Sequence, residues 1–263
     1  MTATDEDSGE FVRALARGLA VIEAFDQQHA ALTLTDVAKR TGVSRATARR
    51  LLLTLTALGY TAKVGRQFAL RPKVLGLGLA YLASFTLTSI AHPFMQELVA
   101  QVHESCSISV LDGADIVYVA RVPAKRIMSI DISVGTRLPA TITSMGRVLL
   151  AALPDQDLDA VLDAARANPR GSHTATARAI SDQETLKAAI RQSGRQGWAM
   201  VDQELEEGLR SIAVPIRGRD GAVVAAMNLG THAVLVPRER LCDELLPALK
   251  ATADNISRAL RLA

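Results

Sequence analysis

Residues 32–58 restrict the fold of this chain more than any other segment, because they specify two short helices that meet at a glycine. The first helix has Thr35 as its expected N-cap and Asp36 in its first turn, where a carboxylate complements the helix dipole. Gly42 ends that helix, since glycine readily adopts the left-handed conformation found at helix C-termini. Ser44 caps the second helix. Two helices joined in this way are typical of a helix-turn-helix.

Patterns on either side of these helices extend the motif. Residues 11–27 predict an amphipathic helix with its apolar positions at Leu15, Leu19, Ile22 and Phe25. The second central helix runs to about residue 58 and is expected to bury Ala48, Leu51, Leu52, Leu55 and Leu58. Residues 60–70 predict two short strands around Gly65. Helix, helix, turn, helix and hairpin in this order predict a winged helix-turn-helix.

Positive charge is concentrated in residues 36–73. They hold nine lysines and arginines against the single acidic residue Asp36, a net charge of +8, whereas the whole chain carries +3. Clustered like charges repel one another in a folded domain, so the excess favours a polyanionic partner over an ordinary solvated surface. Aromatic residues make up only 3% of the chain, which argues against a stacking platform for single-stranded nucleic acid. The expected partner is therefore double-stranded DNA.

The second helix supplies the chemistry for such a contact. Arg45 and Arg49 lie one turn apart, where two positive charges mildly destabilise a helix unless an anion offsets them. Arginine binds guanine edges bidentately, and threonine contacts a thymine methyl group or a phosphate. Arg50 is expected to hold a phosphate. The candidate DNA-binding residues are Thr35, Ser44, Arg45, Ala46, Thr47, Arg49 and Arg50, with Lys63 and Arg66 on the hairpin.

The rest of the chain predicts a linker and a second domain. Pro72 begins a linker helix within residues 71–87 that either pairs with its copy in a dimer or is buried in its own domain. Beyond it, strands are expected at 106–112, 115–122, 128–134, 211–218 and 222–230, and helices at 89–105, from about Ser144, at 155–167, at 182–197 and from Pro237 to the C-terminus. The domains are thus 1–70, 71–87 and 88–263, and the last is an α+β domain with an antiparallel sheet.

Composition and motifs argue against several other classes of protein. The two cysteines are far apart and form no CxxC pair, which favours a reducing cytoplasm. The most apolar run, residues 74–85, is too short to cross a bilayer, so no membrane partner is expected. The five histidines form no HxxxH or HExxH motif, and neither a metal nor a cofactor is expected. An enzyme is not expected either. Ser144 lies in ITSMG, which lacks the first glycine of GxSxG, and a hydrolase using Ser144, His173 and Asp202 is the weaker alternative.

The chain resembles the IclR family of bacterial transcription regulators over nearly its whole length. The resemblance rests on LARGLAVIEAF, LTDVAKRTGVSRATARRLLLTL and the hairpin, and further on LPATITSMGRVLLAAL, VDQELEEGLRSIAVPI and AAMNLG. It implies a winged helix domain, a linker helix and a GAF-like effector-binding domain. It also implies dimers, commonly paired into tetramers, that bind palindromic operators. FVRALARGLAVIEAF and TSMGRVLLA look most like the branch that regulates protocatechuate, 4-hydroxybenzoate and β-ketoadipate metabolism.

The resemblance further implies an effector pocket made by Ser144, Met145, Gly146, Asp202, Gln203, Ser211 and Asn228. Backbone N–H groups at the start of the helix near Ser144 suit a carboxylate. Ser211 falls where several relatives have a cysteine. Three of these positions also fit purely structural roles: Gly146 as a packing glycine, Asp202 as a loop cap and Asn228 as a half-exposed strand residue.

These observations predict a homodimeric or homotetrameric transcription regulator whose operator binding is controlled by a small aromatic or dicarboxylic acid. The alternative is a DNA-binding regulator whose second domain only oligomerises.

Overall fold

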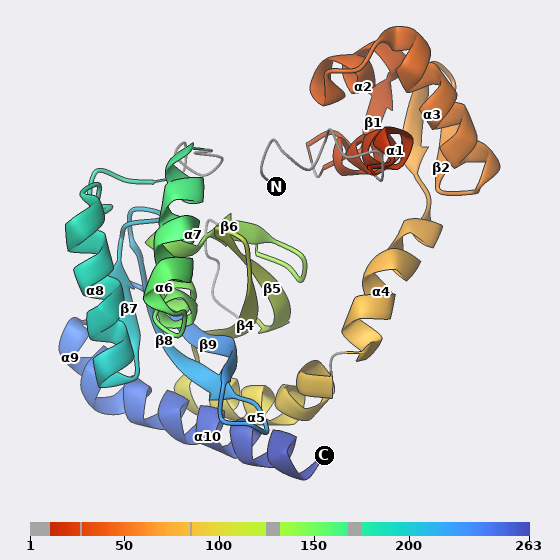
Figure 1. Ribbon diagram of the computed structural model, residues 1–263. Coiled ribbons are helices and arrows are strands. Elements are labelled where there is room, and N and C mark those ends of the chain that lie inside the picture. Colours follow the sequence, from red (N-terminus) through yellow and green to blue (C-terminus); the bar gives the residue numbers. More distant parts are fainter. Residues whose placement is uncertain (1–10, 27, 85, 125–131, 168–174) are drawn as a thin grey trace. The chain divides into compact units, whose positions relative to one another are not determined.

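The computed structural model describes residues 11–26, 28–84, 86–124, 132–167 and 175–263. The chain forms two compact units, Met1–Ser84 and Phe85–Ala263, each with a hydrophobic core (Figure 1). Among the described residues, no helix combines the length and the apolar character needed to cross a membrane.

The first unit is a winged helix-turn-helix, as the sequence predicts. Its elements are α1 (Arg13–Glu23), β1 (Ala31–Thr33), α2 (Leu34–Thr41), α3 (Arg45–Ala57), β2 (Thr61–Val64), β3 (Gln67–Leu70), a 3-10 turn (Pro72–Val74) and α4 (Leu75–Ser84). The strands form an antiparallel sheet in the order β1-β3-β2. Val21, Val37 and Leu52, one from each of the first three helices, are fully buried and pack with Phe68 of β3.

Thr33, and not Thr35, is the N-cap of α2. The Asp36 N–H donates to Thr33 Oγ1, and the Thr33 N–H donates to the Asp36 carboxylate at 3.0 Å, which completes a capping box. Thr35 lies inside the first turn with its side chain exposed. The sequence pattern did not predict strand β1. Because β1 pairs with β3 up to Thr33, the chain is extended there and the helix begins directly afterwards.

Thr33→Ala is therefore expected to lower the free energy of unfolding of the first unit by about 1 kcal/mol, since the capping hydrogen bond is lost. Thr35→Ala removes no such bond and is expected to cost less than about 0.5 kcal/mol. Urea unfolding of the two variants measures the difference, and equal losses would contradict the cap assignment.

Some apolar side chains of the first unit are more exposed than the sequence pattern predicts. Leu58, expected in the core, is 53% exposed, because α3 ends just before it and the chain turns at Gly59 with a φ of 82°. Helix α1 buries Val21, whereas Leu15 and Leu19 are exposed. Helix α1 therefore carries a second apolar stripe that its own unit does not cover.

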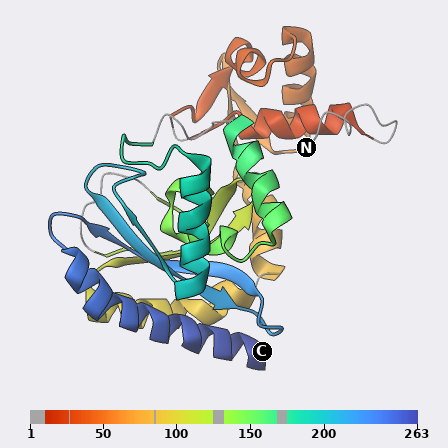
Figure 2. The same cartoon turned by 60° about the vertical axis from the view of Figure 1, so that its left-hand side comes forward.

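The second unit is an α+β domain around one antiparallel sheet, which confirms the predicted fold class. Strands β4 (Ser105–Asp112), β5 (Asp115–Val122), β6 (Arg137–Pro139), β7 (Ala199–Asp202), β8 (Leu209–Arg217) and β9 (Val223–His232) follow the order β6-β5-β4-β9-β8-β7. Helices α5 (Thr86–Val102) and α10 (Leu246–Leu262) cover one face, and α6 (Ser144–Leu150), α7 (Asp155–Ala167) and α8 (Gln183–Gln196) cover the other (Figures 1 and 2). Helix α9 (Arg238–Arg240) and a π-helical turn (Leu241–Leu245) precede α10.

The third strand of this sheet is not where the sequence predicts it. Residues 128–131 of the expected strand lie outside the described residues, and 132–134 form no strand. The chain turns at Gly135, whose φ is 91° and whose N–H donates to Tyr118 O at 2.7 Å, so pairing starts only in β6. The four-residue strand β7 was also not predicted. The other strands agree with the prediction to within two residues.

Candidate DNA-binding face and effector pocket

Helix α3 is held with its basic side exposed. Ser44 is its N-cap, as predicted, and accepts from the Thr47 N–H at 3.1 Å. Gly42, with a φ of 69°, ends α2 just before it. The three guanidinium groups of Arg45, Arg49 and Arg50 are exposed and form no hydrogen bond or ion pair with any described residue. Their charges are therefore available to an external anion.

The buried residues of α3 determine which arginines face outward. Ala48, Leu52 and Leu55 face the core of the unit. At about 100° per residue, Ala46 and Arg50 point directly away from these three side chains. Arg45 and Arg49 lie together on one flank of the helix. The helix thus presents one small residue and one arginine at the centre of its outer face.

The other predicted DNA-binding residues also lie at the surface of the first unit. Lys63 and Arg66 are exposed near the tip of the β2–β3 hairpin, and Thr35 is exposed at the start of α2. The structure therefore leaves all nine predicted residues exposed or, for Thr47, half-buried.

The second unit contains a pocket on the α6 side of the sheet. The polar lining comes from four adjacent strands and includes Ser105, Ser107, Tyr118, Arg121, Ser211 and Asn228. Ile142, Leu205 and Leu209 supply apolar walls. Among the described residues of the lining, Arg121 alone is charged.

Strand register explains why these polar groups converge. Ser107 on β4 pairs with Arg121 on β5 and with Asn228 on β9, so the three lie in one row across one face of the sheet. The neighbouring row contains Ser105 and Gly230. Small residues in both rows leave the space that the pocket occupies.

A β-bulge in β5 brings Arg121 to this face. The register with β4 shifts at Val119, which has no partner on β4. In a regular strand, residues three apart point to opposite faces. The extra residue places Tyr118 and Arg121 on the same face, and both line the pocket. The sequence did not predict either residue as part of the pocket, because a spacing of three residues normally places two side chains on opposite faces of a strand. The alternating serines of β4 were the available signal, since they mark a polar face on a central strand.

Two predicted pocket residues, Ser211 and Asn228, line the pocket, and two others lie behind it. The Ser144 hydroxyl donates to Ser211 Oγ at 2.9 Å and is buried. The Met145 sulfur accepts from Ser109 Oγ at 3.3 Å, also inside the core.

The alternative of a hydrolase finds no support in these contacts. Ser144 donates to Ser211 and not to a base, and Asp202 is paired with Arg210. His173 lies outside the described residues. Within the described part of the chain, no cluster of three or more His, Cys, Asp or Glu side chains could hold a metal ion.

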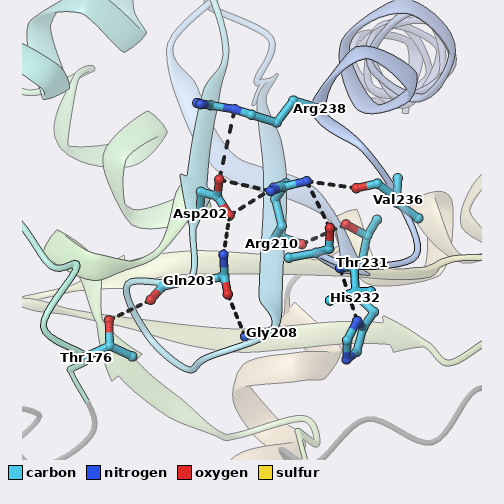
Figure 3. A network of polar contacts seen from close by, with 11 residues as sticks. Thr176, Asp202, Gln203, Gly208, Arg210, Thr231, His232, Val236 and Arg238 are labelled. Carbon is cyan, nitrogen blue, oxygen red and sulfur yellow. Dashed lines mark hydrogen bonds and ion pairs between the residues drawn. The ribbon is translucent and has the colours of Figure 1, made fainter.

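Asp202 and Gln203 belong to a polar network beside the pocket (Figure 3). The two oxygens of Asp202 accept from Arg210 at 2.9 and 3.1 Å. Gln203 has a left-handed φ of 63°, and its side-chain oxygen accepts from the Gly208 N–H at 3.0 Å. Arg210 also donates to Val236 O at 2.8 Å. The network fixes both ends of the loop at 203–208, which contributes an apolar wall of the pocket.

The Arg210 pair makes Asp202 a contributor to stability at neutral pH. Burial raises the pKa of Asp202, but the hydrogen bonds and charge of Arg210 lower it more, and the pKa lies below its ordinary value of 3.8. Because the folded-state pKa is depressed, the contribution is fully present above the ordinary pKa and is lost as the pH falls through the folded-state pKa.

Gly146 has a packing role. A Cβ at this position would overlap the backbone oxygen and Cα of Ala140, so α6 approaches the preceding turn too closely for any side chain. Gly146→Ala is expected to lower the free energy of unfolding of the second unit by about 1–3 kcal/mol.

Gly194→Ala in α8 is the matched control, because its Cβ would lie 3.4 Å from Ala151 Cβ. Alanine there is expected to stabilise the helix by up to about 1 kcal/mol. Chemical denaturation of both variants tests the pair, and a neutral Gly146→Ala would show that α6 can move.

An exposed basic helix in a winged helix-turn-helix, joined to a unit whose pocket has both polar and apolar lining residues, defines a class of protein: the ligand-responsive transcriptional regulator. The chain matches the IclR helix-turn-helix domain model over residues 14–65. It matches the model of the bacterial transcriptional regulator IclR C-terminal domain over residues 79–258. The protein therefore belongs to the IclR family of bacterial transcriptional regulators.

Individual relatives agree with this assignment. The chain is 46% identical over 252 residues to the Pca regulon regulatory protein of Pseudomonas putida, covering 95% of this chain and 85% of that protein. A crystal structure of a protein described as a transcriptional regulator from Rhodococcus sp. RHA1 matches with a TM-score of 0.81 and 52% identity, covering 95% and 98% of the two chains. The inducer-binding domain of a PobR double mutant from Acinetobacter, solved with 3-hydroxybenzoic acid, matches with a TM-score of 0.58 and 29% identity, covering 65% and 97%.

Proposed function

We propose that this protein regulates genes of aromatic-acid catabolism and that a small aromatic or dicarboxylic acid controls its binding to operator DNA. The observation that carries the proposal is the pocket of the second unit, whose charged lining residue, Arg121, forms no ion pair with a described residue. A carboxylate is the group that a guanidinium in such a site binds best. The names of the Pca regulon regulatory protein and of the PobR inducer complex support an effector of this class.

For the first unit we propose that α3 lies in the major groove of the operator. Arg50 and Ala46 then face base edges, because they point directly away from the core. Arg45 and Arg49 face one side of the groove. This assignment differs from the phosphate role that sequence alone gives Arg50. The remaining candidates, Thr35, Ser44, Thr47, Lys63 and Arg66, suit contacts with backbone phosphates.

The protein acts as a homodimer, or as a pair of dimers, in this proposal. Leu15 and Leu19 on α1, and Leu75 and Leu79 on α4, are exposed in the single chain. A second copy that covers these apolar side chains also supplies the second recognition helix that a palindromic operator requires. Sedimentation of the full chain measures the assembly, and a monomer at micromolar concentration would contradict it.

Thermal unfolding with protocatechuate, 4-hydroxybenzoate and β-ketoadipate tests the effector. An acid present at 100 times its Kd stabilises the folded state by about 2.7 kcal/mol, which raises the Tm of the second unit. The same acid is expected to change the affinity for the promoter DNA next to the gene, and by linkage the DNA changes the affinity for the acid by the same factor. No Tm shift and an unchanged DNA affinity would instead favour a second unit that only oligomerises.

A further inference from the structure

We propose that Arg121 and Asn228 read two different groups of one effector, so that the pocket selects carboxylic acids that also carry a hydroxyl group. Arg121 binds the carboxylate, and the amide oxygen of Asn228 accepts a hydrogen bond from the hydroxyl. The inference rests on the proposed function and specifies the ligand of the same pocket.

Arg121 is set up as an anion site. Its Nη1 donates to Ser107 Oγ at 3.3 Å, a contact that orients the guanidinium without neutralising it. No carboxylate of the described residues forms an ion pair with it. Two other arginines of this unit are already occupied, Arg137 by Asp112 and Arg147 by Glu204. Arg121 therefore retains the donors that a bidentate contact with a carboxylate uses.

The bulge at Val119 gives independent support to this role. A regular β5 strand that presented Tyr118 to the pocket would turn Arg121 toward the α5 side of the sheet. Bulges commonly re-aim a single side chain at a functional site. The bulge thus places the positive charge of Arg121 in the pocket.

Asn228 supplies the second group. Asn228 is 8% exposed. Its Oδ1 is the one buried side-chain oxygen or nitrogen among the described residues that has no hydrogen-bond partner. A buried amide oxygen is an acceptor that requires a donor. A carboxylate cannot provide one, whereas a phenolic or alcoholic hydroxyl can. Asn228 lies in the same row of the sheet as Arg121, with Ser107 between them, so one small molecule can reach both.

The remaining lining suits the body of such a molecule. Tyr118 stays neutral, because burial raises the pKa of its hydroxyl to about 12 despite the nearby charge of Arg121. It therefore does not repel an anion. Ile142, Leu205 and Leu209 provide the apolar contact that a ring or a short chain requires.

A set of matched probes tests both contacts in the full-length protein by Tm shift and calorimetric Kd. The probes are 4-hydroxybenzoate, protocatechuate, benzoate, which lacks the hydroxyl, and 4-hydroxybenzamide, which lacks the charge. The wild type is expected to bind a hydroxybenzoate at least about tenfold more tightly than either truncated probe, because each truncation leaves a buried polar group unpaired. β-Ketoadipate is included as an acid without a hydroxyl.

Two substitutions assign the contacts. Arg121→Gln is expected to weaken binding of the hydroxy acid about tenfold or more and to remove its higher affinity relative to the amide. Arg121→Lys is expected to restore part of the lost affinity. Asn228→Leu is expected to remove the preference for 4-hydroxybenzoate over benzoate. Unliganded Tm and operator affinity of each variant show whether the fold is kept.

The outcomes separate this inference from the proposed function. Binding of no acid by the wild type overturns both. Wild-type binding that Arg121→Gln leaves unchanged overturns the Arg121 assignment alone. Equal wild-type affinity for benzoate or β-ketoadipate and for the hydroxy acids overturns the hydroxyl contact at Asn228.

Discussion

Replacing Glu204 with alanine is expected to lower the free energy of unfolding of the second unit by about 3–5 kcal/mol. Glu204 pairs with Arg147 at 2.6 Å, and both side chains are less than 10% exposed. Arg147 also donates to Thr141 O at 3.3 Å, and the Ile180 N–H donates to the Glu204 carboxylate at 3.4 Å. Removing the carboxylate leaves a guanidinium charge buried without a counter-charge, and that desolvation cost dominates the loss.

Two comparisons isolate this cause. The double variant Arg147→Met, Glu204→Leu has no buried charge at this pair. Its free energy of unfolding is expected to lie within about 1–2 kcal/mol of the wild-type value. Glu244→Ala breaks the exposed pair with Arg240, one turn apart at 3.2 Å, and is expected to cost less than about 0.5 kcal/mol. Urea unfolding followed by circular dichroism measures all three. A loss below about 1 kcal/mol for Glu204→Ala would show that the charge of Arg147 reaches water.

The Glu204–Arg147 pair also matters for the pocket. It joins α6 to the loop at 203–208, whose other side is fixed by Asp202 and Arg210. Leu205 in that loop forms part of the pocket wall. Glu204 itself does not line the pocket, so any weakening of effector binding by Glu204→Ala is expected to act through the position of this loop.

Much of the fold follows from local signals in the sequence. Gly42 and Ser44 fix the turn between two helices through backbone conformation and a side-chain cap, and both act within a few residues. Non-local pairing is harder to predict. Strand β1 is three residues long and exists because β3 pairs with it, and this pairing moves the cap of α2 from Thr35 to Thr33.

The pocket shows the same limit. Resemblance to the IclR family pointed to Ser211 and Asn228, which line the pocket. Arg121 could not be found from spacing, because a bulge changes the face of a strand without a clear mark in the sequence. Asp202 does not line the pocket, and its carboxylate is paired with Arg210 instead. This tertiary contact could not be predicted from the sequence.

Alanine at position 50 is expected to weaken operator binding by about 1–3 kcal/mol and to relax specificity at one base pair. Arg50 lies opposite the buried residues Ala48, Leu52 and Leu55, at the centre of the outer face of α3. A helix in the major groove presents this face to the bases. Because Arg50 is exposed and its guanidinium has no partner among the described residues, its removal is expected to leave the Tm unchanged.

Fluorescence anisotropy with operator and scrambled duplexes, at several salt concentrations, distinguishes a base contact from a phosphate contact. Loss of a base contact weakens binding to the operator far more than binding to the scrambled duplex. Loss of a phosphate contact weakens binding to both duplexes alike and reduces the salt slope by about one. Lys63→Ala on the hairpin is the control for the second behaviour, and Arg45→Ala and Arg49→Ala test the flank of the helix. Equal losses on the two duplexes for Arg50→Ala, with a reduced slope, would assign Arg50 to the phosphate backbone and move base readout to the flank.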